Sequence, residues 1–207
     1  MTIKPIETFY NGYRFRSRLE ARWAVFFDTL GIRYQYEPEG FVLSDGTYYL
    51  PDFYLPDFKF WVEVKGVMDE ESKRKIDLFA DSLNWKKSRL WILRDIPNTS
   101  GCFWKDDLPE DAFWVFAKDA ADGPYLPCIC PGCGEVGIEF DGRGWRVDGC
   151  TLEDTMFLVY PDAGSIHHED KGYSYEAPKI VRAYAAARQA RFEHGEAPTI
   201  RKEVIPF

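Results

Sequence analysis

The sequence predicts an α/β protein in which helices flank a mixed sheet, followed by a small cysteine-bearing module and a C-terminal helix. Two stretches carry apolar residues at helical spacing, while other segments alternate or run apolar in the manner of strands. A strand, a helix and another strand in that order favour a parallel strand pair. With 207 residues, 45% of them hydrophobic, the chain is long enough for a main domain, residues 1–126, and a satellite, residues 127–207.

The N-terminal residues predict a short hairpin and then the first helix. Asn11-Gly12 is typical of a hairpin turn and lies among aromatic and basic side chains. We expect a helix to begin at Ser17 and to end at Gly31. Its apolar positions follow helical spacing, at Leu19, Trp23, Phe26, Phe27 and Leu30.

Glu20 has two interpretations. Ser17 and Glu20 have the spacing of a capping box, in which the Glu20 carboxylate would bond the backbone amide of Ser17. The surrounding positive charge exceeds what one cap needs and favours a chemical role; it comes from Arg14, Arg16, Arg18 and Arg22.

After this helix the chain predicts an antiparallel meander of three or four strands. Residues 33–37 and 41–43 have strand composition, and Asp45-Gly46 is typical of a turn. Pro56-Asp57 is then interpreted as a two-residue turn of a further hairpin. That turn predicts three cross-strand pairs, Leu55 with Phe58, Asp52 with Trp61, and Leu50 with Glu63.

The second strand of this hairpin alternates strictly and is expected to be half buried. Its apolar side would carry Phe58, Phe60, Val62 and Val64, and its other side Lys59, Trp61, Glu63 and Lys65. Asp52 would share a face with Glu63, with α-carbons roughly 7–8 Å apart, close enough for both carboxylates to reach one divalent ion. The alternative is a solvated strand face with a cross-strand ion pair.

A second helix and a buried strand complete the predicted main domain. Residues 70–83 carry an inward apolar stripe made by Ile76, Phe79, Ala80 and Leu83. Residues 89–94 form a short apolar strand, which we expect to be internal and parallel to its neighbour because a helix connects them.

Glu20 in a helix, Pro51-Asp52, and Glu63-Val64-Lys65, set among helix, meander, helix and strand, resemble the PD-(D/E)xK nuclease superfamily, which includes restriction endonucleases and RecB-type nucleases. The resemblance covers about residues 13–95 and implies a restriction-endonuclease-like core. It implies that Asp52, Glu63 and the Val64 carbonyl hold Mg²⁺ or Mn²⁺. Lys65 would orient or deprotonate the attacking water, and Glu20 would join through water or bind a second ion.

The charge distribution is compatible with DNA as the partner despite a net charge of −8. Residues 101–176 hold 16 acidic and 5 basic side chains, whereas residues 1–66 hold 9 and 8. The half that bears the motif is therefore nearly neutral, and an acidic chain does not exclude DNA. Basic residues near the motif are candidates for nucleic-acid binding, namely Arg14, Arg16, Arg18 and Lys73.

The cysteines predict a structural zinc site. Cys130-Pro131-Gly132-Cys133-Gly134 has the form of a zinc knuckle, and Cys150 stands at a distance suited to the opposite side of a ribbon. Cys128 is the nearest fourth ligand, and His167 or His168 is the alternative. After this module, a basic helix is expected to begin at Ala177-Pro178 and to end before Gly195, with Ile180, Val181, Tyr184 and Ala185 packed inward.

We expect a cytoplasmic protein without a membrane partner. No apolar run approaches the roughly 20 residues of a membrane helix, and the N-terminus lacks the core of a signal peptide. Five cysteines, an odd number with three clustered, fit a reducing compartment better than a disulfide framework.

The function predicted from the sequence is metal-dependent hydrolysis of DNA phosphodiester bonds. The alternative is a nucleic-acid-binding adaptor that keeps the fold and the zinc module and does not cleave. Endonuclease and exonuclease activity, and restriction, homing, repair or recombination roles, remain open, as does a homodimer.

Overall fold

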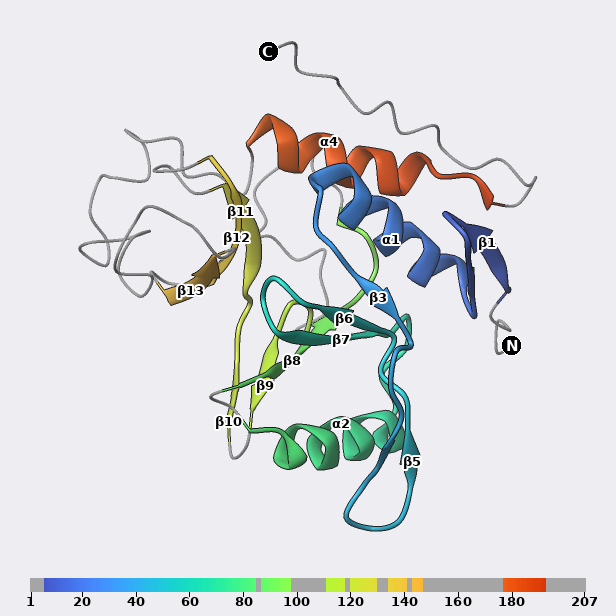
Figure 1. Cartoon of the computed structure of the whole chain (residues 1–207), viewed down its shortest axis with the longest axis vertical. Helices are drawn as coiled ribbons and strands as arrows, with labels where there is room; N and C mark the ends of the chain where they lie inside the picture. Colours follow the sequence, from blue (N-terminus) through green and yellow to red (C-terminus); the bar gives the residue numbers. More distant parts are fainter. Residues whose placement is uncertain are drawn as a thin grey trace.

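The computed structural model describes residues 6–84, 87–97, 111–117, 120–129, 134–140, 143–146 and 177–192. A six-stranded mixed sheet with the order β10-β9-β8-β7-β6-β3 forms its central layer. Helices α1 (Arg18–Leu30) and α4 (Pro178–Gln189) lie on one side of this sheet, and α2 (Glu70–Ser82) lies on the other (Figure 1). The predicted α/β class, with a mixed sheet flanked by helices, is confirmed.

Local signals place the N-terminal hairpin and the first helix as predicted. Strands β1 (Thr8–Tyr10) and β2 (Tyr13–Phe15) are antiparallel, and the turn between them places Asn11 at φ 47° and Gly12 at φ 84°. Two positive φ angles are typical of the hairpin turn that Asn-Gly favours. Ser17 caps α1 by accepting the N–H of Glu20, and Gly31 ends it in the left-handed region at φ 76°.

The predicted single meander is wrong, because one of its hairpins leaves the sheet. Strand β3 (Gln35–Tyr36) pairs with β6 (Phe53–Leu55), whereas β4 (Phe41–Val42) and β5 (Tyr48–Tyr49) pair only with each other. The rings of Phe41 and Tyr49 lie 4.8 and 4.7 Å from that of Phe79 on α2. Packing against α2 therefore turns this hairpin away from the sheet to cover the helix.

The hairpin of β6 and β7 (Phe60–Val64) has a different register from the predicted one. Its connection has four residues, 56–59, with Lys59 at φ 59°. The observed pairs are Phe53 with Val62, Tyr54 with Trp61, and Leu55 with Phe60. The predicted pairs are thus wrong by two residues, and an even shift leaves every side chain on its predicted face.

Strand β7 is buried on both faces, so the prediction of a half-buried strand is wrong. Phe60, Val62 and Val64 belong to the core on the side of α1 and α4, and Trp61 belongs to the core on the side of α2. All five residues of the strand are buried, including Glu63 at 3% exposure. The reason is the central position of β7 between two helical layers, which the alternation pattern alone does not reveal.

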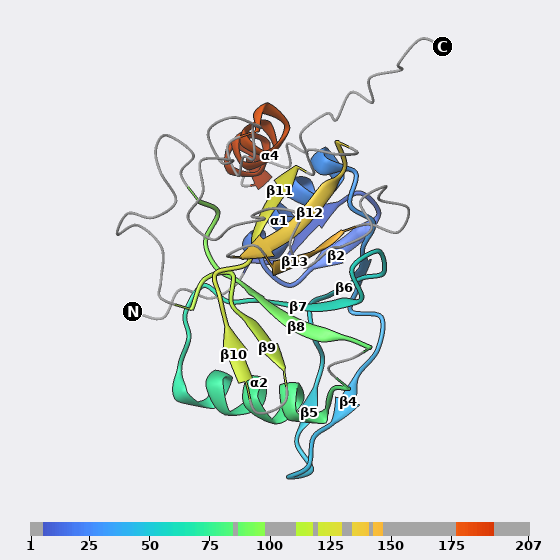
Figure 2. The ribbon, with the colours of Figure 1, turned by 90° about the vertical axis from the view of Figure 1, so that its left-hand side faces the viewer.

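Beyond β7 the sheet continues as predicted and then adds two strands. Strand β8 (Arg89–Leu93) is parallel to β7 and follows α2, whose buried face carries Ile76, Phe79 and Ala80. Strand β9 (Val115–Ala117) pairs antiparallel with β8, and β10 (Ala120–Asp122) pairs antiparallel with β9. Both lie above α2 in Figure 2.

A second, three-stranded antiparallel sheet contains β11 (Leu126–Ile129), β12 (Val136–Phe140) and β13 (Arg143–Arg146). It lies on the same side of the central sheet as α4 (Figure 2). Leu126 and Ile138 belong to the same buried cluster as Trp23 on α1 and Tyr184 on α4. One core therefore crosses the predicted boundary between residues 126 and 127.

Helix α4 begins at Pro178 as predicted. It ends at Gln189, so the prediction that it continues up to Gly195 is wrong. Its buried residues are Ile180, Ala183, Tyr184 and Ala187, because these positions face α1. The Tyr184 ring lies 4.5 Å from that of Phe26. Among the described helices, none is long and apolar enough to cross a membrane.

Candidate active site

Four side chains from three parts of the fold are brought together at the end of β7. Glu20 lies in the first turn of α1, Asp52 directly precedes β6, Glu63 is in β7, and Lys65 follows β7. Continuing the register of β6 and β7 places Asp52 opposite Glu63. The sheet thus supplies two carboxylates side by side, and α1 supplies the third.

Glu63 is held between a phenol and an ammonium group. The Tyr49 hydroxyl donates to Glu63 Oε2 at 2.8 Å, and Lys65 Nζ lies 2.5 Å from Glu63 Oε1. Burial, and then the neighbouring Glu63 carboxylate, raise the pKa of Tyr49 well above its usual value, so this phenol stays protonated and donates. Sequence reasoning missed Tyr49, since nothing in its spacing separates it from the other tyrosines.

Asp52 is a buried carboxyl group whose negative form is only partly compensated by its neighbours. It is 6% exposed, and its Oδ2 accepts the backbone N–H of Val64 at 2.7 Å. Its Oδ1 lies 3.8 Å from the Arg16 guanidinium. Burial, followed by repulsion from Glu63 and Glu20, raises the pKa of Asp52 well above its usual value, against the opposing effects of the Val64 N–H and Lys65.

Glu20 is both a cap and a neighbour of the other carboxylates. Its carboxylate accepts from the backbone N–H of Arg16 at 3.0 Å, the Ser17 hydroxyl at 2.6 Å and the Tyr36 hydroxyl at 2.7 Å. The cap on the Arg16 amide differs from the predicted one on Ser17. Glu20 also raises the pKa of Asp52, so it contributes to the field of the site. Tyr36 is a second site residue that sequence reasoning missed.

Lys65 is an ammonium group in this arrangement. Burial by itself lowers its pKa, but the attraction of Glu63, a hydrogen bond to Glu63 and the attraction of Asp52 outweigh burial and raise it. The side chain is 30% exposed, so it reaches from the buried carboxylates towards solvent. It can therefore donate hydrogen bonds to a ligand that approaches from solvent.

The four predicted nucleic-acid-binding residues differ in their relation to the site. Arg16 forms an ion pair with Glu37 and approaches Asp52, which places it at the site. Arg14 is an exposed residue of β2, where it pairs with Glu7. Arg18 begins α1, and Lys73 is on α2, paired with Glu70 at 2.9 Å. The approach of Arg16 to Asp52 thus connects it directly with a site carboxylate.

The donor set at the end of β7 fits one hard divalent cation held by few protein ligands. Within the described residues no group of three His, Cys, Asp or Glu side chains is arranged to hold a metal. Mg²⁺ characteristically uses one or two carboxylates and keeps several waters. Asp52 and Glu63 offer two such carboxylates, and a bound cation would offset the repulsion between them. Glu20, already bonded to three donors, does not suit a direct ligand.

The predicted zinc ligands fall largely outside the described residues. Cys130, Cys133, Cys150, His167 and His168 all lie there, and the zinc site stays a prediction. Cys128 is buried in β11, opposite Gly137 of β12. Gly134, the last residue of the predicted knuckle, has φ 74°, a left-handed conformation that suits a glycine in a tight turn.

Comparison with protein families, curated proteins and solved structures found no match for this chain. The chemistry of the site therefore has to be inferred from its own geometry. That geometry is three buried carboxylates, one ammonium group and one arginine, converging where two neighbouring strands of the sheet meet the first helix.

Without metal, the Asp52→Asn variant should be more stable than the wild type at pH 8. Folding raises the pKa of Asp52, so protonated Asp52 favours the folded state. This contribution to the free energy of unfolding is fully present below the unfolded pKa of about 3.9 and is lost as the pH rises through the folded pKa. Asparagine keeps an acceptor for the Val64 N–H. We expect its melting temperature in EDTA to exceed that of the wild type by about 2–4 °C at pH 8 and to match it near pH 4.

The exposed Asp45 is the matched control for this stability measurement. A hydrogen bond from the Thr47 backbone, and then Arg74, lower the pKa of Asp45 to about 2, so Asp45→Asn should gain no stability as the pH rises. An Asp52→Asn variant that is less stable than the wild type at pH 8 would contradict the assignment of uncompensated charge to this carboxylate.

Proposed function

We propose that this protein is a metal-dependent DNA nuclease of the PD-(D/E)xK type, which hydrolyses phosphodiester bonds. The observation that carries the proposal is the buried cluster of Glu20, Asp52 and Glu63, each at most 7% exposed, with Lys65 in contact with Glu63. Burying several carboxylates together costs free energy of folding unless a cation or a substrate group binds to them, so such clusters are typical of functional sites.

The fold supports a restriction-endonuclease-like core. Helix α1, the antiparallel strands β6 and β7, helix α2 and the parallel strand β8 follow one another, and the site lies at the end of the central strand β7. This is the order of elements on which the sequence resemblance rests.

The residues have complementary tasks in hydrolysis. A divalent cation held by Asp52, Glu63 and the Val64 carbonyl would neutralise charge on the scissile phosphate and activate water. Lys65 keeps its proton beside Glu63, so it enters as an ammonium donor that can orient that water. Arg16, 54% exposed, can pair with a phosphate oxygen of the DNA backbone.

The test is incubation of purified protein with linear, nicked, branched and single-stranded DNA in magnesium, manganese or EDTA. Magnesium or manganese should support cleavage of at least one of these substrates, and EDTA should abolish it. Cleavage that persists in excess EDTA would contradict a metal-dependent mechanism.

Glu20→Gln should separate the chemical role of this residue from its capping role. Glutamine keeps one acceptor for the neighbouring donors but removes the negative charge next to Asp52. We expect the cleavage rate to fall about 10- to 100-fold, which is typical when a residue that supports a metal ligand without binding the metal itself is replaced. The melting temperature should change little. Unchanged cleavage together with lower stability would show that Glu20 is only a cap.

A further inference from the structure

The hydroxyl of Tyr49 reaches the candidate active site from outside the central sheet. Tyr49 lies on β5, which pairs with β4 in a separate two-stranded sheet. Its hydroxyl donates to Glu63 Oε2 at 2.8 Å, and Glu63 belongs to β7 inside the six-stranded sheet. The hairpin that leaves the central sheet therefore returns a hydrogen-bond donor to it at the site.

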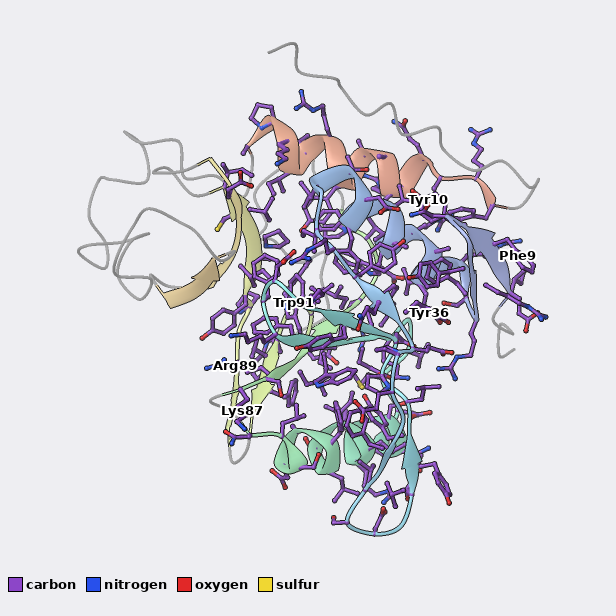
Figure 3. All side chains as sticks on the ribbon, viewed as in Figure 1. Phe9, Tyr10, Tyr36, Lys87, Arg89 and Trp91 are labelled. Atoms are coloured by element: carbon purple, nitrogen blue, oxygen red, sulfur yellow. The ribbon has the colours of Figure 1, made fainter. Side chains whose placement is uncertain are left out.

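Packing against α2 fixes the position of this donor. The Tyr49 ring lies 4.7 Å from that of Phe79 on α2, and the residue is 7% exposed. Side chains fill the space between the β4–β5 hairpin and α2 (Figure 3). Asp45, between the two strands of the hairpin, forms an ion pair with Arg74 on α2. Since a tyrosine side chain turns about only two angles, a packed ring leaves its hydroxyl little freedom to move.

The two donors to Glu63 differ in their freedom to move. Tyr49 contacts one carboxylate oxygen, Oε2, and Lys65 Nζ lies 2.5 Å from the other, Oε1. The Lys65 side chain is 30% exposed, and its ammonium group ends a flexible stem of four carbons. In the proposed mechanism this ammonium group orients water, so its contact with Glu63 changes during the reaction. Tyr49 is neutral and buried, so it can hold Glu63 throughout.

Glu63 needs such a hold because its neighbours pull it away from Asp52. The two carboxylates repel each other, and Lys65 attracts Glu63 towards solvent. A cation shared by both carboxylates requires them to stay side by side. Residues that orient a metal ligand by a hydrogen bond typically contribute 10- to 100-fold to metal affinity.

We propose that Tyr49 is a positioning residue, whose hydroxyl holds Glu63 Oε2 so that this carboxylate stays beside Asp52 and the pair takes up one divalent cation. This inference rests on the proposed nuclease function, which gives the cation its role. It also gives the departure of the β4–β5 hairpin from the sheet a function, because the hairpin brings Tyr49 to Glu63.

The test is binding of Mn²⁺ to the full chain without DNA, followed by the electron paramagnetic resonance signal of the free ion. Tyr49→Phe keeps the ring on Phe79 and removes only the hydroxyl. We expect this variant to bind Mn²⁺ about tenfold more weakly than the wild type. The magnesium concentration for half-maximal cleavage should rise by a similar factor, and saturating magnesium should restore most of the cleavage rate.

Tyr48 is the matched control, because it is the neighbouring tyrosine on β5 and is 84% exposed. Tyr48→Phe should bind Mn²⁺ like the wild type. Melting temperatures in EDTA verify that both variants are folded. Wild-type Mn²⁺ affinity in folded Tyr49→Phe would overturn the proposal, and so would an equal loss of affinity in Tyr48→Phe.

A measurement on the wild type covers the case in which Tyr49→Phe does not fold. Tyrosine is labelled with ¹³C at the ζ carbon, and NMR spectra in mixed H₂O and D₂O report how slowly each hydroxyl proton exchanges. The Tyr49 signal is assigned by its proximity to the Phe79 ring. Its hydroxyl should exchange slowly both in EDTA and in saturating magnesium. Fast exchange in saturating magnesium would overturn the proposal.

The positioning role and the nuclease can fail separately. Mn²⁺ binding that depends on Tyr49, without cleavage of any DNA substrate by the wild type, would support the positioning role and overturn the nuclease. Metal-dependent cleavage by the wild type, together with wild-type Mn²⁺ affinity in Tyr49→Phe, would overturn the positioning role alone.

Discussion

Replacing Glu63 with glutamine should reduce DNA cleavage by about 10³-fold or more while the protein stays folded. Glutamine has the same shape and can still accept the Tyr49 hydrogen bond. It removes the negative charge that lies against Lys65 and faces Asp52. The site then loses one of the two carboxylates that can hold the cation and the partner that keeps Lys65 in place.

The measurement is the initial rate in magnesium on the substrate that the wild type cleaves best. Glu70→Gln is the matched control, because Glu70 is an exposed glutamate on α2 that also pairs with a lysine, Lys73. The control should cleave like the wild type. Asp52→Ala and Lys65→Ala should lose activity as Glu63→Gln does, and a wild-type rate in Glu63→Gln would remove these residues from the mechanism.

Trp23→Ala should lower the free energy of unfolding by about 3–5 kcal/mol, which is the usual cost of removing a large buried aromatic side chain. Trp23 is fully buried on α1, with ring centroids 5.9 Å from Phe113 and 6.3 Å from Tyr184. Its Nε1–H donates to the Arg94 carbonyl at 2.7 Å, a bond that alanine cannot replace. The side chain thus links α1 to the end of β8, to the segment before β9 and to α4.

Thermal and urea unfolding measure this loss, and a fall of about 10 °C or more in melting temperature is expected. Phe9→Ala is the control, because Phe9 is 72% exposed on β1 and its removal should change stability by no more than about 0.5 kcal/mol. A Trp23→Ala variant as stable as the Phe9→Ala control would contradict a single core that joins α1 and α4.

The sequence by itself determined the features that depend on near neighbours along the chain. Asn11-Gly12 forms its turn, Ser17 and Gly31 bound α1, and Pro178 starts α4, because each signal acts within one turn of backbone. The common face of Asp52 and Glu63 was also predictable. Side chains alternate between the two faces of a strand, so a register that is wrong by two residues still places Asp52 and Glu63 on the same face.

Only the tertiary structure decided the features that depend on contacts between distant segments. The burial of β7 on both faces and the departure of the β4–β5 hairpin from the sheet follow from packing against helices, and the register of β6 and β7 was likewise seen only in the folded chain. The same holds for Tyr36 and Tyr49, which became partners of Glu20 and Glu63 through hydrogen bonds that cross 16 and 14 residues of sequence. Such contacts leave no periodic pattern, because the residues that form them are neighbours only after folding.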